Sequence, residues 1–217
     1  MKIVPDINLS YILLKFIYLE KEKVKFKEIF NNRSKSIRFL VVLILAVIFL
    51  FYESTESKLI DRLGNNQELI SKFNDFKLDG YENDINLPIE ILESVIDTAK
   101  SYLGVSNKVG GTSRDSIDAS GLIYVSINAN SEFKFPRIAQ DMARYGKIIT
   151  KKKKLKRGDL VFFFDTYEID RIVTSVGIYL GEDKFLNSST NNGVSESDIN
   201  DPYYWSDKFF FGTRIFK

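Results

Sequence analysis

The sequence predicts an α+β fold in which helices pack on one side of an antiparallel sheet. Apolar residues recur at three- and four-residue spacing up to about residue 104, as on one face of a helix. Short β-branched and aromatic runs follow from about residue 160. Helices first and strands afterwards are typical of the α+β class. With 217 residues, of which 44% are hydrophobic and 14% aromatic, the chain can bury a sizeable core, and we expect one ordinary domain with additional segments.

Two residue types are missing from the composition. The chain has no cysteine and no histidine. Disulfides, thiolate nucleophiles, zinc sites built from cysteine and histidine, and imidazole bases are therefore excluded, and we expect no metal and no cofactor. The net charge is +2, but residues 1–38 alone hold nine basic and four acidic side chains, a local charge of +5. Because the basic excess is local, nucleic acid is not an expected partner.

An uncharged segment, FLVVLILAVIFLFY at residues 39–52, follows the basic region. As a helix it would be about 21 Å long, against about 30 Å for a bilayer core, but flanking residues can lengthen the span. Because the segment is apolar on every face, we predict a single transmembrane helix at residues 37–54. A buried core helix and a cleaved signal peptide are the alternatives, although no small-residue cleavage site follows Tyr52. By the positive-inside rule, residues 1–36 lie in the cytoplasm and the rest of the chain lies outside.

Shorter segments lie on either side of the predicted anchor. Within residues 1–36, the apolar run 11–19 and the lysines after it predict either an amphipathic helix on the membrane surface or a loosely ordered tail. Residues 55–86 predict a stalk of two short helices, which is broken at Gly64 and ends in a polar linker. We therefore place a domain boundary near residue 86, with a C-terminal domain at residues 87–217.

The C-terminal domain begins with two predicted helices. Pro88 suits a first helical turn, and helical spacing continues to Gly104. A second helix begins near residues 118–120, whose side chains can cap free amide groups, and extends to about Ile127. The predicted strands lie at residues 160–164, 173–180, 184–187 and 213–216. The aromatic residues at 203–205 and 209–211 are expected in the core.

Six short motifs of the C-terminal domain occur in a characteristic order. They are AKSYLGV at 99–105, GGTS at 110–113, DASGL at 118–122, FPR at 135–137, LKRGDLVFF at 155–163 and VGIYLG at 176–181. In this order and spacing they resemble the NlpC/P60 family, papain-like bacterial cysteine peptidases that cut the stem peptides of peptidoglycan. The resemblance covers residues 95–217 and implies a papain-like fold. Because a fold does not determine an activity, the site residues must be considered separately.

The positions that carry catalysis in this family hold other residues in this chain. The nucleophilic cysteine at the start of a helix corresponds to Ala119, and the histidine that takes its proton corresponds to Ser175. Alanine has no atom that can attack a peptide bond, and serine is not a base at neutral pH. The polar residue that orients the histidine corresponds to Asn187, and Asn107 replaces a tyrosine at the substrate end of the site. These replacements predict a pseudoenzyme, which is not catalytic.

Other groups could in principle replace the missing pair. Ser120 is the nearest hydroxyl, but on a helix it points about 100° away from residue 119. A Ser–Lys pair would need a lysine such as Lys108, which we expect in an exposed loop, and a carboxylate mechanism would need acidic residues that converge. A hydrolase with an unconventional nucleophile is therefore the alternative to a pseudoenzyme.

Three residues match positions that hold the stem peptide in active members of the family. They are Asp118, Ser120 and Arg137, and together with Asn107 they form the predicted ligand-binding set. The Arg137 guanidinium could pair with a ligand carboxylate in a bidentate contact. Alternatively, Asp118 and Ser120 only cap the helix, and Arg137 lies in a surface turn.

The sequence thus predicts a membrane-anchored domain on the outer side of a bacterial cytoplasmic membrane. We expect it to bind cell-wall stem peptide or an envelope protein without cleaving it. A structural subunit of a membrane assembly, in which the groove is unused, is a further alternative.

Overall fold

The computed structural model describes residues 54–217 of the chain. The predicted cytoplasmic segment 1–36 and all but the last residue of the predicted anchor 37–54 lie outside this range. Among the described residues, no helix is both long enough and apolar enough to cross a bilayer. Ser54 caps a short helix, because its hydroxyl accepts a hydrogen bond from the Ser57 amide at 3.0 Å.

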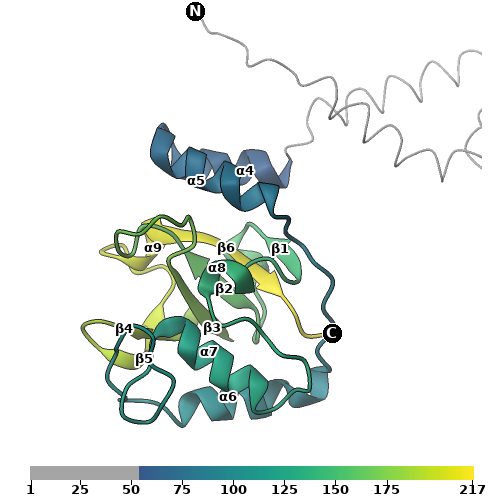
Figure 1. Ribbon diagram of the computed structural model, residues 1–217, viewed down its shortest axis with the longest axis vertical. Coiled ribbons are helices and arrows are strands. Elements are labelled where there is room, and N and C mark those ends of the chain that lie inside the picture. Colours follow the sequence, from purple (N-terminus) through teal and green to yellow (C-terminus); the bar gives the residue numbers. More distant parts are fainter. Residues whose placement is uncertain (1–53) are drawn as a thin grey trace, which may run out of the picture. The chain divides into compact units, whose positions relative to one another are not determined.

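A six-stranded antiparallel sheet lies at the centre of the described unit (Figure 1). The strands are β1 (Lys147–Ile149), β2 (Leu160–Phe163), β3 (Ser175–Gly181), β4 (Lys184–Ser189), β5 (Gly193–Asp198) and β6 (Phe209–Arg214). Their order in the sheet is β1-β6-β2-β3-β4-β5. The C-terminal strand β6 therefore lies inside the sheet, between β1 and β2, and β1 and β5 are the edges. This architecture confirms the predicted α+β class with an antiparallel sheet.

Hydrophobic side chains on the two faces of the sheet form two separate clusters. In β2, Leu160 and Phe162 belong to the larger cluster, whereas Val161 and Phe163 belong to the smaller one. The alternation follows from the two-residue period of a strand. All four side chains are buried, which indicates that both faces of the sheet are covered.

Two helices contribute to the larger cluster and lie beside the same face of the sheet (Figure 1). They are α6 (Leu92–Lys100) and α7 (Ala119–Asn128), and they correspond to the two predicted helices. A turn follows α6 and ends at Gly104, whose φ of +81° favours glycine over residues that carry a Cβ. The short helical segments are η1 (Ile89–Ile91), α8 (Ala139–Met142), η2 (Lys152–Lys154) and α9 (Trp205–Lys208).

The two helices predicted at 55–86 are present, as α4 (Thr55–Leu63) and α5 (Gln67–Leu78), but they are not a separate stalk. Phe73 of α5 is fully buried, and its ring centroid lies 5.6 Å from that of Phe210 in β6. The Arg62 guanidinium of α4 donates to the backbone oxygens of Phe209 and Thr150, at 3.4 Å and 2.5 Å. Residues 54–217 form one compact unit, so the boundary predicted near residue 86 does not divide the structure.

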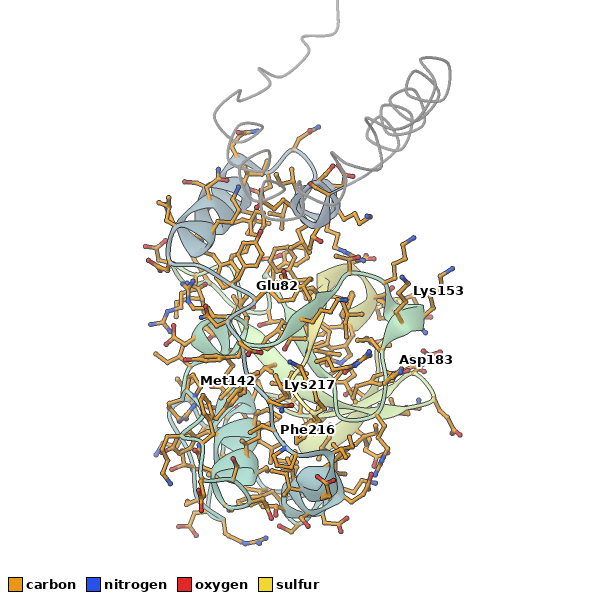
Figure 2. All side chains as sticks on the ribbon, turned by 90° about the vertical axis from the view of Figure 1, so that its right-hand side faces the viewer. Glu82, Met142, Lys153, Asp183, Phe216 and Lys217 are labelled. Atoms are coloured by element: carbon orange, nitrogen blue, oxygen red, sulfur yellow. The ribbon has the colours of Figure 1, made fainter. Side chains whose placement is uncertain are left out.

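The polar segment 79–86 is likewise held against the sheet. The Asn83 amide donates to the Arg144 carbonyl at 2.7 Å, and the Glu82 carboxylate accepts from the Ile148 amide at 2.9 Å. Just beyond it, Leu87 exchanges backbone hydrogen bonds with the C-terminal residues, two of which, Phe216 and Lys217, are labelled in Figure 2. Polar composition predicted a linker here, but these contacts lie between residues far apart in the sequence, which local patterns do not reveal.

Near the C-terminus, the observed strand and aromatic burial differ from the prediction. The strand predicted at 213–216 begins at Phe209, because the buried aromatic run 209–211 pairs with the neighbouring strand β2. The expectation of a buried aromatic group at 203–205 holds for Trp205 only. Tyr203 is 94% exposed and Tyr204 is 41% exposed.

Candidate functional site

The first turn of α7 forms one end of the site. Asp118 is the N-cap residue, and its Oδ1 accepts a hydrogen bond from the Gly121 amide at 2.6 Å. Ala119 is therefore the first residue of the helix, where the positive end of the helix dipole lies. The loop before the helix packs closely on this turn, since a Cβ on Gly121 would lie 2.2 Å from the Gly111 carbonyl oxygen.

Asp118, Ser120 and Arg137 form one hydrogen-bonded network. Arg137 Nη2 lies 2.8 Å from Asp118 Oδ2, and Arg137 Nη1 donates to Ser120 Oγ at 2.8 Å. Ser120 Oγ in turn donates to Asp118 Oδ1 at 3.2 Å. The second Asp118 oxygen also accepts from the Gly110 amide at 2.6 Å, and Arg137 Nη2 donates to the Gly111 carbonyl at 3.0 Å. Asp118 therefore caps α7, as one of the two alternatives predicted, and the same carboxylate is paired with Arg137.

The charge of Asp118 is stabilised by this network. Burial alone would raise the pKa of the carboxyl group, but hydrogen bonds from Arg137 and from the amides of Gly121 and Gly110 outweigh burial and hold the pKa below its usual range. Asp118 is therefore ionised at neutral pH. Its charge is compensated by Arg137, which makes the pair a structural element of the site.

The strand side of the site is formed by β3 and β4. Ser175 is the first residue of β3 and is 7% exposed. Ser188 of β4 accepts a hydrogen bond from Asn107 Nδ2 at 2.9 Å and donates to the Ile117 carbonyl at 2.7 Å. Asn107 is thereby fixed at the base of the loop that precedes α7.

Asn187 occupies a different environment from the other predicted residues. It is completely buried, and neither its Oδ1 nor its Nδ2 has a hydrogen-bond partner among the described residues. A Cβ built on Gly177 of β3 would lie 3.3 Å from the Cβ of Asn187, so Asn187 lies beside Gly177. Because alternate residues of a strand point to the same face, Asn187 shares a face of the sheet with Ser175.

A groove of about 570 Å³ joins the two sides of the site. Six of the seven predicted residues line it: Asn107, Asp118, Ala119, Ser120, Arg137 and Ser175. Asn187 does not. The residues that correspond to the cysteine and histidine positions of the family thus face one groove, as the resemblance implies.

The groove also contains residues that the sequence analysis did not identify. Ser188 comes from β4, and the loop between β2 and β3 contributes Tyr167, Arg171 and Thr174. Tyr167 and Arg171 lie in a stretch with no helical or strand periodicity and no family motif, so no sequence signal indicated their role, whereas Thr174 falls within the strand predicted at 173–180. Within residues 54–217, no group of three acidic side chains is arranged to hold a metal ion.

Comparison with known proteins gives consistent matches over this part of the chain. The family model described as the NlpC/P60 family matches residues 104–214. A relative from Haemophilus influenzae, named "Probable endopeptidase", is 34% identical over 135 residues, which cover 62% of this chain and 81% of the relative. A relative from Escherichia coli K12, named "Murein DD-endopeptidase MepS/Murein LD-carboxypeptidase", is 28% identical over 63% of this chain and 69% of its own length.

A solved structure shares the same architecture. It is a lipoprotein-like NLP/P60 family protein from Staphylococcus aureus, with a TM-score of 0.52 and 29% identity. The match covers 61% of this chain and 43% of that protein. The papain-like NlpC/P60 fold predicted from the motifs is therefore confirmed.

The same relatives contradict the prediction that this chain is not an enzyme. Both are named endopeptidases, and such matches point to an enzyme. The prediction was drawn from Ala119 and Ser175, and these residues exclude only one chemistry, in which a thiolate is activated by an imidazole. They do not exclude catalysis by other groups in the groove, such as the Ser120 hydroxyl.

Proposed function

Since the chain belongs to the NlpC/P60 family, we propose that it acts on the peptide part of the bacterial cell wall and that the groove beside α7 binds this peptide. The observation that carries the proposal is the convergence of the family's peptide-holding positions, Asp118, Ser120 and Arg137, on one groove. A peptide needs such fixed polar groups in a largely preformed cleft.

The hydrogen bonds and the exposure of Arg137 support peptide binding at the α7 end of the groove. Arg137 is held by three acceptors, so little side-chain freedom is lost when a ligand arrives. The Arg137 side chain is still 30% exposed. Each remaining N–H group can donate to a peptide carbonyl.

The binding proposal is tested by obstructing the groove. The full chain is incubated with purified stem peptides, and affinity is measured by isothermal titration calorimetry. Ala119→Phe places a ring in the groove and should weaken binding at least about tenfold, by steric exclusion. The matched control is Ala129→Phe, at the exposed C-terminal end of the same helix, which should bind as the unmodified chain does. Equal affinity in both variants would refute the groove as the binding site.

Hydrolysis of the bound peptide is a second candidate function, favoured by the names of the relatives. Because Ala119 has no nucleophilic atom and Ser175 is not a base, hydrolysis requires another group, and among the hydroxyl groups that line the groove we choose Ser120, which follows Ala119 directly in the sequence. Its proton is directed at Asp118, whose lowered pKa makes it a weak base.

This candidate requires two results from one assay. Mass spectrometry of stem peptides incubated with the unmodified chain must show cleaved fragments, and Ser120→Ala must abolish them. Fragments that persist in Ser120→Ala would exclude Ser120 as the nucleophile. The absence of fragments at peptide concentrations that saturate the groove would refute hydrolysis and leave binding.

The location of the domain is also part of the proposal. Residues 37–54 would anchor the chain in the cytoplasmic membrane and hold the groove on the outer side, near peptidoglycan. Removal of residues 1–53 should release the protein from the membrane fraction, whereas high salt should not. A chain that is extracted by salt alone would refute a spanning anchor.

A further inference from the structure

Two arginines line the groove, and their surroundings differ. Arg137 is engaged by Asp118, Ser120 and the Gly111 carbonyl. Arg171, from the loop between β2 and β3, has no hydrogen bond or ion pair from its side chain to any of residues 54–217. Arg171 is only partly exposed, so its charge is only partly solvated by bulk water.

The backbone around Arg171 is held from several directions. Gln140 of α8 accepts hydrogen bonds from the amides of Ile172 and Val173, at 3.0 Å and 3.3 Å. Lys72 of α5 donates to the Ile169 carbonyl at 2.9 Å. The backbone of this loop is therefore fixed on both sides of Arg171 by α5 and α8, and Arg171 lines the groove.

Tyr167 of the same loop supplies a second free donor. It also lines the groove, and its hydroxyl has no hydrogen-bond partner in the described part of the chain. Burial raises the pKa of this phenol, while the nearby positive charge of Arg171 acts in the opposite direction. The phenol therefore keeps its proton at neutral pH and can donate it in a hydrogen bond.

The acidic residues near Arg171 do not neutralise it. Glu168 and Asp170 are exposed neighbours in the loop, but neither lines the groove, and both interact electrostatically with Lys72. Asp165 lies 3.4 Å from the Lys208 ammonium group. Asp118, which does line the groove, is paired with Arg137. The groove therefore presents one uncompensated charge, and this charge is positive.

We propose that Arg171, assisted by the Tyr167 hydroxyl, binds a carboxylate of the peptide ligand and so selects acidic peptides. A guanidinium can hold a carboxylate through two parallel hydrogen bonds, and a phenol can donate a third. This role was expected of Arg137, but three of its N–H groups already donate within the protein and its charge is paired with Asp118. The proposal rests on the proposed function, because it specifies which peptide the groove accepts.

The test compares two forms of one ligand on the full chain. The probes are synthetic L-alanyl-γ-D-glutamyl-L-lysine with free carboxylates and the same peptide with its carboxylates converted to carboxamides. The unmodified chain should bind the acid form about ten- to a hundredfold more tightly than the amide form, in line with the strength of charge-assisted hydrogen bonds. Arg171→Gln should remove most of this preference by weakening binding of the acid form alone. Tyr167→Phe should reduce it in part.

A matched control separates the contact from net charge. Lys153 is an exposed cation outside the groove, at the edge of the view in Figure 2, and Lys153→Gln removes the same charge. It should leave the preference unchanged. If the unmodified chain binds both forms equally, or if Arg171→Gln keeps the preference, the carboxylate proposal is wrong but peptide binding stands. If neither form binds, the proposed function itself fails, and the selectivity proposal fails with it.

Discussion

At the level of single residues, Asp118 shows how one side chain can support both the fold and the site. Its first oxygen caps α7, and its second oxygen holds the loop at Gly110 and the guanidinium of Arg137. Because the cap and the ion pair share one carboxylate, a substitution that is meant to test binding here will also alter stability. For this reason the tests above avoid Asp118 and Arg137.

The charge on Asp118 makes a contribution to stability that depends on pH. A carboxyl group whose pKa is lower in the folded state stabilises the fold above its unfolded pKa, near about 3.9, and loses this contribution as the pH falls through the folded value. Asp118→Asn keeps a capping oxygen but removes the charge. We expect it to lower the free energy of unfolding by about 1–2 kcal/mol at pH 7. The difference from the unmodified chain should shrink in urea titrations as the pH falls below the unfolded pKa, and a difference that is constant with pH would contradict the assignment.

The positions of Ala119 and Ser175 lead to a second prediction. Both line the same groove, Ala119 begins α7, and Asn187 lies buried with unpaired polar atoms on the same side of the sheet as Ser175. The double substitution Ala119→Cys with Ser175→His should therefore create a thiol at a helix N-terminus near an imidazole. We expect cleavage of stem peptides at least about 100-fold faster than by the unmodified chain, as measured by chromatography.

The single substitutions serve as controls for this pair. Each one supplies only half of the arrangement, so each should add little activity. Thermal unfolding must show that the double variant is folded, because Ser175 is buried and histidine is larger. A folded double variant that binds peptide but cleaves no faster would show that side chains at positions 119 and 175 are not placed to react together.

At the level of elements, the sequence predicted what local patterns encode. The start of α7 was predicted from its capping residues, and the buried strands β2 and β3 from their β-branched and aromatic runs. The edge strand β5, with sequence GVSESD, was missed because it is polar and pairs with β4 through its backbone only in the folded chain. The same limit applies to the groove, because the loop that supplies Arg171 is positioned by α5 and α8 from distant parts of the sequence.

The packing of the loop against α7 can be tested at Gly121. Replacing a helical glycine with alanine usually stabilises a protein by about 0.5–1 kcal/mol. Here the new Cβ would lie 2.2 Å from the Gly111 carbonyl oxygen, which is a backbone atom and cannot simply turn aside. Gly121→Ala should therefore destabilise the fold by about 1–3 kcal/mol in denaturant titrations. A gain in stability would show that the loop can move away from the helix.

At the level of the whole unit, the N-terminal helices are part of the core. Phe73 and Phe76 of α5 are buried in the larger hydrophobic cluster, together with residues of α6, α7 and the sheet. Lys72 of the same helix supports the loop that carries Arg171. The helices that were predicted to be a stalk therefore connect the fold to one wall of the groove.

This connection predicts that residues 54–217 unfold as one cooperative unit. Phe73→Ala removes a ring that packs edge-on against Phe210 and should destabilise the fold by about 3–5 kcal/mol. Circular dichroism and tryptophan fluorescence should report the same shifted transition, since Trp205, the single tryptophan of the chain, lies in the other hydrophobic cluster. Leu78→Ala, in the same helix but 84% exposed, is the matched control and should change the stability by less than about 0.5 kcal/mol. If Phe73→Ala instead produced an early helical transition with the tryptophan signal unchanged, the helices would be an independent segment, and their support of the groove would have to be rejected.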